Sequence, residues 1–183
     1  MKQDRQSRVV RRIRRRDTGF GSAGSSARHH GGLGRLDACP PTAVVVLKPD
    51  HVRDVDLFVC RYDARAFGPR LFFRNDVPET ELEVIEPGSQ LPGGLVALYD
   101  GRGRNETPLW LPEQRVLVFA DALTAPRGEL RIWASPSHEQ RALPALHALL
   151  ELPFEQVLVS HGELVHTRSA FERALSRPME RIA

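Results

Sequence analysis

The stretch from residue 42 to residue 62, TAVVVLKPDHVRDVDLFVCRY, decides the fold of this chain. Its first six residues form an apolar, largely β-branched run that is typical of a buried strand. Its last nine residues, Asp54 to Tyr62, carry apolar side chains at helical spacing. Between the two lies a polar turn, Lys48-Pro49-Asp50-His51. A strand, a polar turn and a helix in this order are typical of a layered α/β protein with polar groups at strand ends.

The rest of the chain continues the alternation of short strands, turns and helices. Gly and Pro separate the apolar runs, which is typical of tight turns between strands. We expect strands at 64–68, 71–73, 82–85, 94–99, 109–111, 115–120, 130–134 and 156–159, and helices at 138–152 and 167–175, with Thr167 as an N-cap. This order predicts a mixed sheet covered by helices.

Length and composition point to one soluble-type domain with a tail. The chain has 183 residues, of which 41% are hydrophobic and 27% charged. No apolar run approaches the roughly 18–20 residues of a membrane span, so we expect no membrane partner. Cys39 and Cys60 form no CxxC motif, which favours a reducing, cytoplasmic location.

The basic residues are concentrated at the N-terminus. Residues 1–38 carry ten Lys and Arg against three acids, which leaves the remainder with a net charge of −4. The segment lacks a periodic apolar face, so we predict a disordered basic tail at 1–38 and one domain at 39–183. The tail could be a nucleic-acid arm, a targeting peptide or a solvated extension without function. We favour the extension, and nucleic acid is not an expected partner.

Three apolar strands are each followed by an acid or a histidine. Asp50 and His51 follow the first strand, Asp121 follows the run RVLVFA, and His161 follows VLVS. Two carboxylates and two imidazoles form a plausible ligand set for a zinc- or iron-class divalent ion. Alternatively, the acids cap a helix and a turn, and the histidines bond to loop backbone.

The order and context of these residues resemble the metallo-β-lactamase superfamily over residues 41–178. Asp50-His51 matches the end of that family's HxHxDH motif. FADAL, at residues 119–123, resembles its GDAL run, and SHG, at 160–162, its terminal HG. The resemblance implies a four-layer αββα sandwich. Because residues 1–38 do not have strand character, it also implies that the first strands of the fold are lacking, which would leave a sheet edge open and favour a homo-oligomer.

The same alignment shows a selective loss of ligands. Val46 and Lys48 stand where the family has its first two histidines, and Arg102 stands where it has the third. The resemblance therefore implies that one metal site is lost and that the second is retained, with the ligands Asp50, His51, Asp121 and His161. Lys48 and Arg102 could replace the missing cation, hold an anionic substrate group, or pair with Asp50 and Asp121 in a metal-free network.

Two functions from different classes follow from this pattern. The first is hydrolysis of a small ester, thioester, phosphoester or lactam by a water activated on one divalent metal, with zinc expected before iron or manganese. In that case Lys48 or Arg102 would stabilise developing negative charge. The second is a pseudoenzyme that keeps the fold without any metal, its site charge-paired. A weaker third hypothesis is nucleic-acid association through the tail.

Two further residues carry expectations of their own. Glu106 lies close in sequence to Arg102, so we expect an ion pair between them. His166 follows the HG sequence by four residues, and we expect it on the surface.

Overall fold

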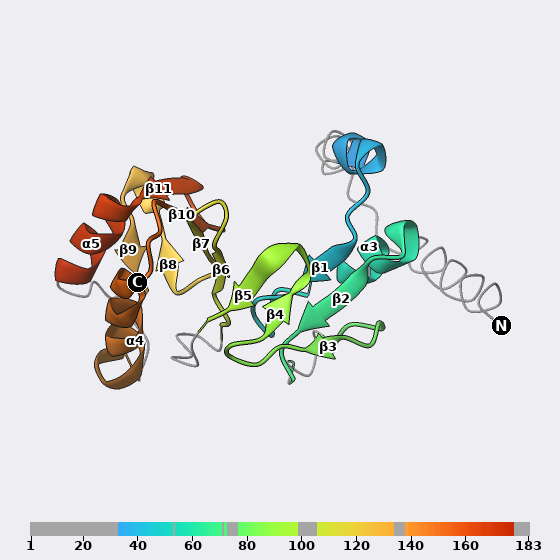
Figure 1. Ribbon diagram of the computed structural model, residues 1–183, viewed down its shortest axis with the longest axis horizontal. Coiled ribbons are helices and arrows are strands. Elements are labelled where there is room, and N and C mark those ends of the chain that lie inside the picture. The colour runs from blue at the N-terminus through green and yellow to red at the C-terminus, as the bar shows by residue number, and fades with distance from the viewer. Residues whose placement is uncertain are drawn as a thin grey trace, which may run out of the picture.

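The fold has four layers, two sheets face to face with helices on both outer faces. The computed structural model describes residues 33–52, 54–70, 72, 77–98, 106–133 and 138–177. In Figure 1 the layers follow one another from α4 and α5 on the left, through the two sheets, to α3 on the right. The predicted α/β class with helices outside the sheets is confirmed.

The first sheet is small and parallel. It consists of β1 (Ala43–Val45), β2 (Arg65–Gly68) and β3 (Glu83–Val84), in that spatial order. Helix α3 (Val55–Tyr62) joins β1 to β2 and covers the outer face of this sheet through a cluster of Val46, Val52, Val55 and Ala66. The strand–turn–helix unit predicted from residues 42–62 is therefore confirmed.

The second sheet has six strands. Asp121 and His161 follow two of these strands. The strand order of the sheet is β11-β10-β7-β6-β5-β4. β7 and β10 run parallel with four paired residues, whereas the other neighbours are antiparallel. The bounds are β4 (Gln90–Leu91), β5 (Leu95–Ala97), β6 (Leu109–Leu111), β7 (Val116–Phe119), β10 (Gln156–Val159) and β11 (Val165–Thr167).

Apolar side chains form one cluster between the sheets and a second beneath the helical layer of α4 and α5. Between the sheets lie Phe67, Ile85, Leu91, Ala97 and Leu109. The larger cluster lies under α4 (Leu143–Ala148) and α5 (Arg168–Ser176), where Phe171 contacts the rings of Phe119 and Phe154. A hairpin of β8 (Leu123–Thr124) and β9 (Arg131–Ile132) closes its side.

Several predicted elements differ in detail from the observed ones. The helix expected at 138–152 consists of a π-helical turn at His138–Ala142, then α4, then a 3-10 turn at Leu149–Glu151. Pro144 lies in the first turn of α4 and has no N–H to donate, which favours the change in winding there. Three short strands, β4, β8 and β11, were not predicted. At the start of α5, Thr167 accepts a hydrogen bond from the backbone N–H of Ala170, as expected of an N-cap.

Two predictions fall wholly or partly outside the described residues. The strand expected at 71–73 is described only at Phe72, which is not in a strand. Of the tail predicted at 1–38, only residues 33–38 are described, and they are helical. Asp37 in this helix accepts hydrogen bonds from Arg61 and Tyr62 of α3. The boundary at residue 38 stays a prediction.

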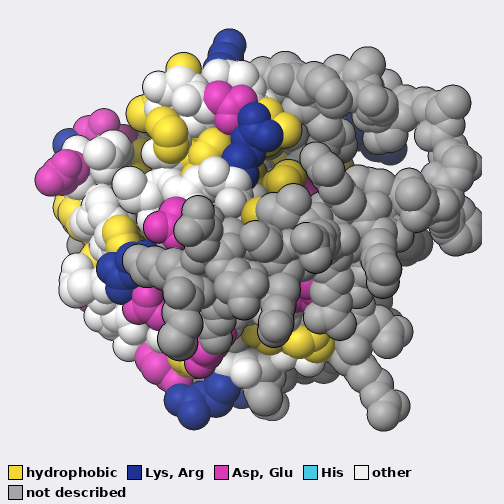
Figure 2. All heavy atoms as spheres, turned by 90° about the vertical axis from the view of Figure 1, so that its right-hand side faces the viewer, with side chains coloured by type: hydrophobic (Ala, Val, Ile, Leu, Met, Phe, Trp, Pro, Cys, Tyr) yellow, Lys and Arg dark blue, Asp and Glu magenta, His cyan; other side chains and the backbone are white. Residues whose placement is uncertain are grey.

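Some of the charged side chains on the α3 side of the molecule form pairs of opposite sign. Arg65 pairs with Glu83, and Arg70 with Glu86. Figure 2 shows this face, where the Lys and Arg side chains of the described residues lie among Asp and Glu side chains. In the described part of the chain, no helix is long and apolar enough to cross a membrane.

Replacing Phe171 with alanine tests the larger core. Its side chain is fully buried between two other phenylalanines, so we expect Phe171→Ala to lower the free energy of unfolding by about 3–5 kcal/mol. Urea unfolding followed by circular dichroism measures this. Leu164→Ala is the control, because Leu164 is 60% exposed and should change stability by less than about 0.5 kcal/mol. Equal effects of the two changes would contradict this core assignment.

Candidate metal centre

Three loops meet at one edge of the sheets because of how the strands pair. β7 and β10 are parallel neighbours, with Phe119 opposite Val159, so the residues that follow them come out side by side. The loop after β1 is held to the second sheet by a hydrogen bond from the Thr107 N–H to the Leu47 carbonyl. Polar residues following all three strands are thereby brought to the same place.

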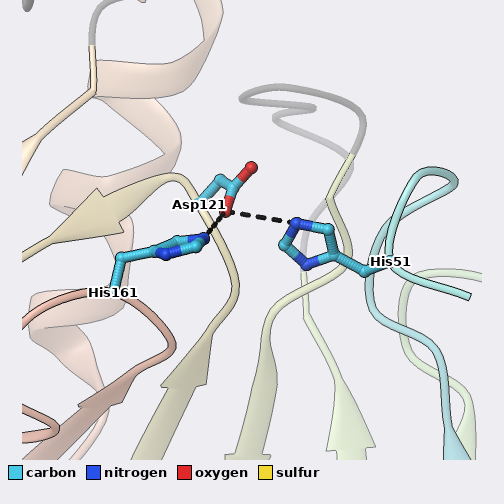
Figure 3. Close-up of side chains that lie close together, drawn as sticks. All are labelled: His51, Asp121 and His161. Atoms are coloured by element: carbon cyan, nitrogen blue, oxygen red, sulfur yellow. Dashed lines mark ion pairs between the residues drawn. The ribbon is translucent and has the colours of Figure 1, made fainter. Parts of the chain in front are cut away.

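His51, Asp121 and His161 converge at this edge. One ligand atom from each lies within 4.8 Å of the others. The Nε2 atoms of His161 and His51 approach the same oxygen, Asp121 Oδ1, at 3.0 and 3.5 Å. Figure 3 shows the two rings pointing toward the carboxylate from opposite sides. Three of the four predicted ligands therefore lie together.

This donor set suits a divalent metal ion. Two imidazoles and one carboxylate hold zinc in several hydrolases and iron(II) in the facial-triad proteins. The Asp121 side chain is 7% exposed, whereas those of His51 and His161 are 20% and 46% exposed. A metal ion held here would thus have a buried carboxylate behind it and solvent in front. The residues present fit a metal ion.

The fourth predicted ligand, Asp50, faces Lys48. Both oxygens of the Asp50 carboxylate accept hydrogen bonds from Lys48 Nζ, and Asp50 is not part of the three-residue group. Lys48 Nζ also lies 2.8 Å from Asp121 Oδ2. The Lys48 side chain is only 3% exposed. A buried ammonium therefore links the two acids that the sequence analysis selected.

The ammonium of Lys48 controls the ionisation of both acids. Partial burial acts to raise the pKa of Asp121 and of Asp50, but the hydrogen bond and the charge of Lys48 outweigh it and hold both values below the ordinary range. The two carboxylates are therefore ionised at neutral pH.

Val46 and Arg102, which the resemblance placed at the positions of further histidines, have separate outcomes. Val46 is buried in the cluster beneath α3, as an ordinary core residue. Arg102 lies outside the described residues, so its predicted role stays a prediction.

Glu106 has a role that the sequence analysis missed. Its carboxylate, expected to pair with Arg102, is buried and accepts hydrogen bonds from the backbone N–H groups of residues 120, 121 and 122 at 2.6–2.7 Å. Burial raises the pKa of Glu106 to about 7, although these three donors act to lower it. Glu106 thus fixes the turn that carries Asp121. Its position three residues before the short apolar run at 109–111 was the only sequence signal.

Two residues that follow His161 in the chain complete the description of this loop. The prediction for His166 was wrong, and the role of Gly162 was not predicted. His166 is 7% exposed rather than on the surface, and its Nε2 lies 2.7 Å from the Glu163 carbonyl. Gly162 has a φ of 89°, and a Cβ there would lie 2.0 Å from the Ala125 carbonyl oxygen. The chain can approach Ala125 this closely only with glycine, and this approach lets the His161 carbonyl accept a hydrogen bond from the Ala125 N–H.

Comparisons with solved structures agree on the fold. TTHA1623, in a di-iron-bound form, is 20% identical, with a TM-score of 0.61 over 82% of this chain and 84% of that one. The metallo-β-lactamase FIM-1 from Pseudomonas aeruginosa, in a mono-zinc form, is 17% identical, with a TM-score of 0.60 over 79% and 71%. The chemotaxis sensor ODP, captured as a peroxy di-iron species, is 12% identical, with a TM-score of 0.57 over 84% and 77%.

Sequence comparisons add nothing to this. No protein-family model matches the chain, and no curated protein matches it either. The structural likeness shows that the chain has the metallo-β-lactamase fold. Solved proteins with this fold include a lactamase and a sensor, so the fold alone does not determine the function.

Replacing Glu106 tests whether it fixes the Asp121 turn. In Glu106→Ala three buried N–H groups lose their acceptor, so we expect the free energy of unfolding to fall by roughly 3 kcal/mol or more. Chemical unfolding of the purified variant measures the loss. Glu113→Ala, at an exposed turn before β7, should have almost no effect. A Glu106→Ala protein as stable as this control would show that the carboxylate is dispensable.

Proposed function

We propose that this chain is a hydrolase that uses one divalent metal ion, held by His51, Asp121 and His161. The observation that carries the proposal is the approach of two imidazole nitrogens to one buried carboxylate oxygen at a sheet edge. We propose that Asp50, the fourth ligand expected from the sequence, remains hydrogen-bonded to Lys48 and does not bind the metal ion.

A divalent ion in such a site polarises a carbonyl or phosphoryl oxygen and lowers the pKa of a water molecule, which can then attack an ester, thioester, phosphoester or lactam. The side chains around the site prepare it for this chemistry. Lys48 holds Asp121 Oδ2, which leaves Oδ1 directed at the two histidines. Glu106 fixes the backbone on which Asp121 stands.

In this proposal Lys48 acts in place of a second metal ion. A dinuclear centre would supply more positive charge to the acids than a single ion does. Here the Lys48 ammonium lies between Asp50 and Asp121 and offsets part of their charge. Because the ion-pair partners that the structure describes for Lys48 are these two carboxylates, Lys48 supports the site through Asp121. We propose it as a positioning residue rather than as a group that contacts the substrate.

The alternative is a pseudoenzyme whose site is held by charge pairing alone. The contacts of Lys48 with Asp50 and Asp121 favour it, because the same ammonium already neutralises part of the acidic charge without a metal. The two proposals differ in what they predict for the histidines. A metal site needs both imidazoles as ligands, whereas a charge-paired site does not.

Metal content separates the two proposals most directly. We expect the full chain, purified without a His-tag, to retain about one equivalent of zinc, iron or manganese. The double variant Asp121→Ala/His161→Ala should retain none, because two of the three ligands are removed. Elemental analysis by inductively coupled plasma mass spectrometry gives the ratio. The control Glu151→Ala/His147→Ala also removes one acid and one histidine, but from exposed positions, and should keep the metal. Absence of metal from the wild type and from both variants would favour the pseudoenzyme.

A second prediction concerns Lys48. Removing one member of a buried charge pair costs about 3–5 kcal/mol, so Lys48→Met should destabilise the chain strongly. If the histidines and Asp121 bind metal, zinc should recover part of this loss, because the ion replaces the missing positive charge. Thermal unfolding with one equivalent of zinc and with EDTA measures both effects.

The matched control for this experiment is Arg70→Met, which removes a cation from an exposed ion pair with Glu86. It should cost less than about 1 kcal/mol. Its response to zinc should equal that of the wild type. A Lys48→Met protein that gains no more from zinc than this control would count against the metal site.

A further inference from the structure

An open, mainly apolar pocket of about 280 Å³, called the cavity below, lies where the end of β1 faces β7 and β10, and His51 forms part of its lining. One wall is formed by Val45 and Leu47, at the end of β1, and the other by Val118 on β7 and Leu158 on β10. None of the described residues that line it is an acid, a lysine or an arginine. The cavity therefore suits an uncharged, apolar group.

The cavity is lined by one of the three proposed ligands and by the residues that precede the other two. His51 itself is part of the wall. Ala120 and Ser160 also line it, and these residues immediately precede Asp121 and His161. The Ser160 hydroxyl already donates a hydrogen bond to the Ala120 carbonyl at 2.6 Å, so this polar group is satisfied within the wall. One end of a ligand bound in the cavity would therefore lie next to His51, Asp121 and His161, which are shown in Figure 3.

The pairing of the strands extends this apolar surface as a strip. Leu158 pairs with Val118 on one side and with Val165 on the other, and paired residues project on the same face of a sheet. Val118 and Leu158 are half-buried, whereas Val165 is 53% exposed. The strip therefore leads from the interior toward solvent, which suits an extended chain better than a compact ring.

The size of the cavity limits the ligand. Pockets for drug-sized molecules usually have volumes of about 300–1,000 Å³, so this one is slightly smaller than that range. A short or medium hydrocarbon chain fits such a space. A nucleotide, a peptide or a charged cofactor does not match its size or its apolar lining.

We propose that the cavity binds the straight acyl chain of a short- or medium-chain ester or thioester whose carbonyl lies at the His51, Asp121 and His161 centre. This assignment rests on the hydrolase proposed above and names its substrate class. In the reaction, a water oxygen forms the new bond to the acyl carbon and the carbon–oxygen or carbon–sulfur bond breaks. The acyl group leaves as a carboxylic acid, and the departing alcohol or thiol receives the proton.

Binding of straight-chain alcohols tests the cavity without metal or catalysis. Isothermal titration of the full chain in EDTA, with 1-butanol, 1-hexanol and 1-octanol, should show affinity rising about fourfold for each added methylene until the cavity is full. In Leu158→Trp the indole fills the space, so 1-octanol should bind at least tenfold more weakly. Leu164→Trp places the same side chain at an exposed position of the same hairpin and should bind within twofold of the wild type.

A second variant covers the case in which Leu158→Trp does not fold. Leu158→Ala enlarges the cavity, so it should bind 1-decanol more tightly than the wild type does. The assignment would be overturned if the wild type bound none of these alcohols. Equal affinities in Leu158→Trp and Leu164→Trp would overturn it as well.

Hydrolysis is measured separately on zinc-loaded protein, with 4-nitrophenyl esters from acetate to decanoate. We expect kcat/KM to rise with acyl length and this dependence to disappear in Leu158→Trp. Alcohol binding without hydrolysis of any ester would show that the cavity is a ligand site but that the proposed hydrolase is wrong. Hydrolysis that is independent of chain length would retain the hydrolase and overturn the acyl-chain assignment.

Discussion

The parallel pairing of β7 with β10 is the constraint on which the candidate centre depends. Four consecutive residue pairs hold the two strands in one register, so Asp121 and His161, far apart in the chain, come out beside each other. Both strands lie above the large apolar cluster that Phe171 and its neighbours complete. Because the pairing is central and buried, the loops that follow it start from a rigid base.

Around this base, buried charges determine where each polar side chain points. The Glu106 carboxylate accepts hydrogen bonds from three backbone N–H groups and thereby fixes the turn at Asp121. Lys48 holds one oxygen of Asp121 and leaves the other facing the histidines. The arrangement offsets much of the cost of burying these ions, since each is held by opposite charge or by several hydrogen bonds. The same contacts arrange the candidate group of His51, Asp121 and His161 and place an ammonium next to it.

The sequence predicted some of these features and missed others for identifiable reasons. The strand, turn and helix of residues 42–62 followed from local apolar patterns, which the structure confirms. The short strands β8 and β11 were missed, because each is held by pairing with the neighbouring strand of its hairpin rather than by an apolar pattern of its own. The contacts of Glu106 with backbone N–H groups fourteen to sixteen residues further along the chain were not predicted, because nothing in the local sequence marks them, and its expected pair with Arg102 lies outside the described residues.

By itself, the sequence determined the types of residue available and the strand ends at which they stand, because these depend only on local order and side-chain chemistry; that Val46 and Lys48 occupy the positions of missing histidines is what the family resemblance implies. Only the tertiary structure decided that His51, Asp121 and His161 converge while Asp50 turns to Lys48. It also decided that an apolar cavity opens beside them. The physical reason is that distances between loops are set by strand pairing and by the packing of two sheets, both of which join residues remote in the chain.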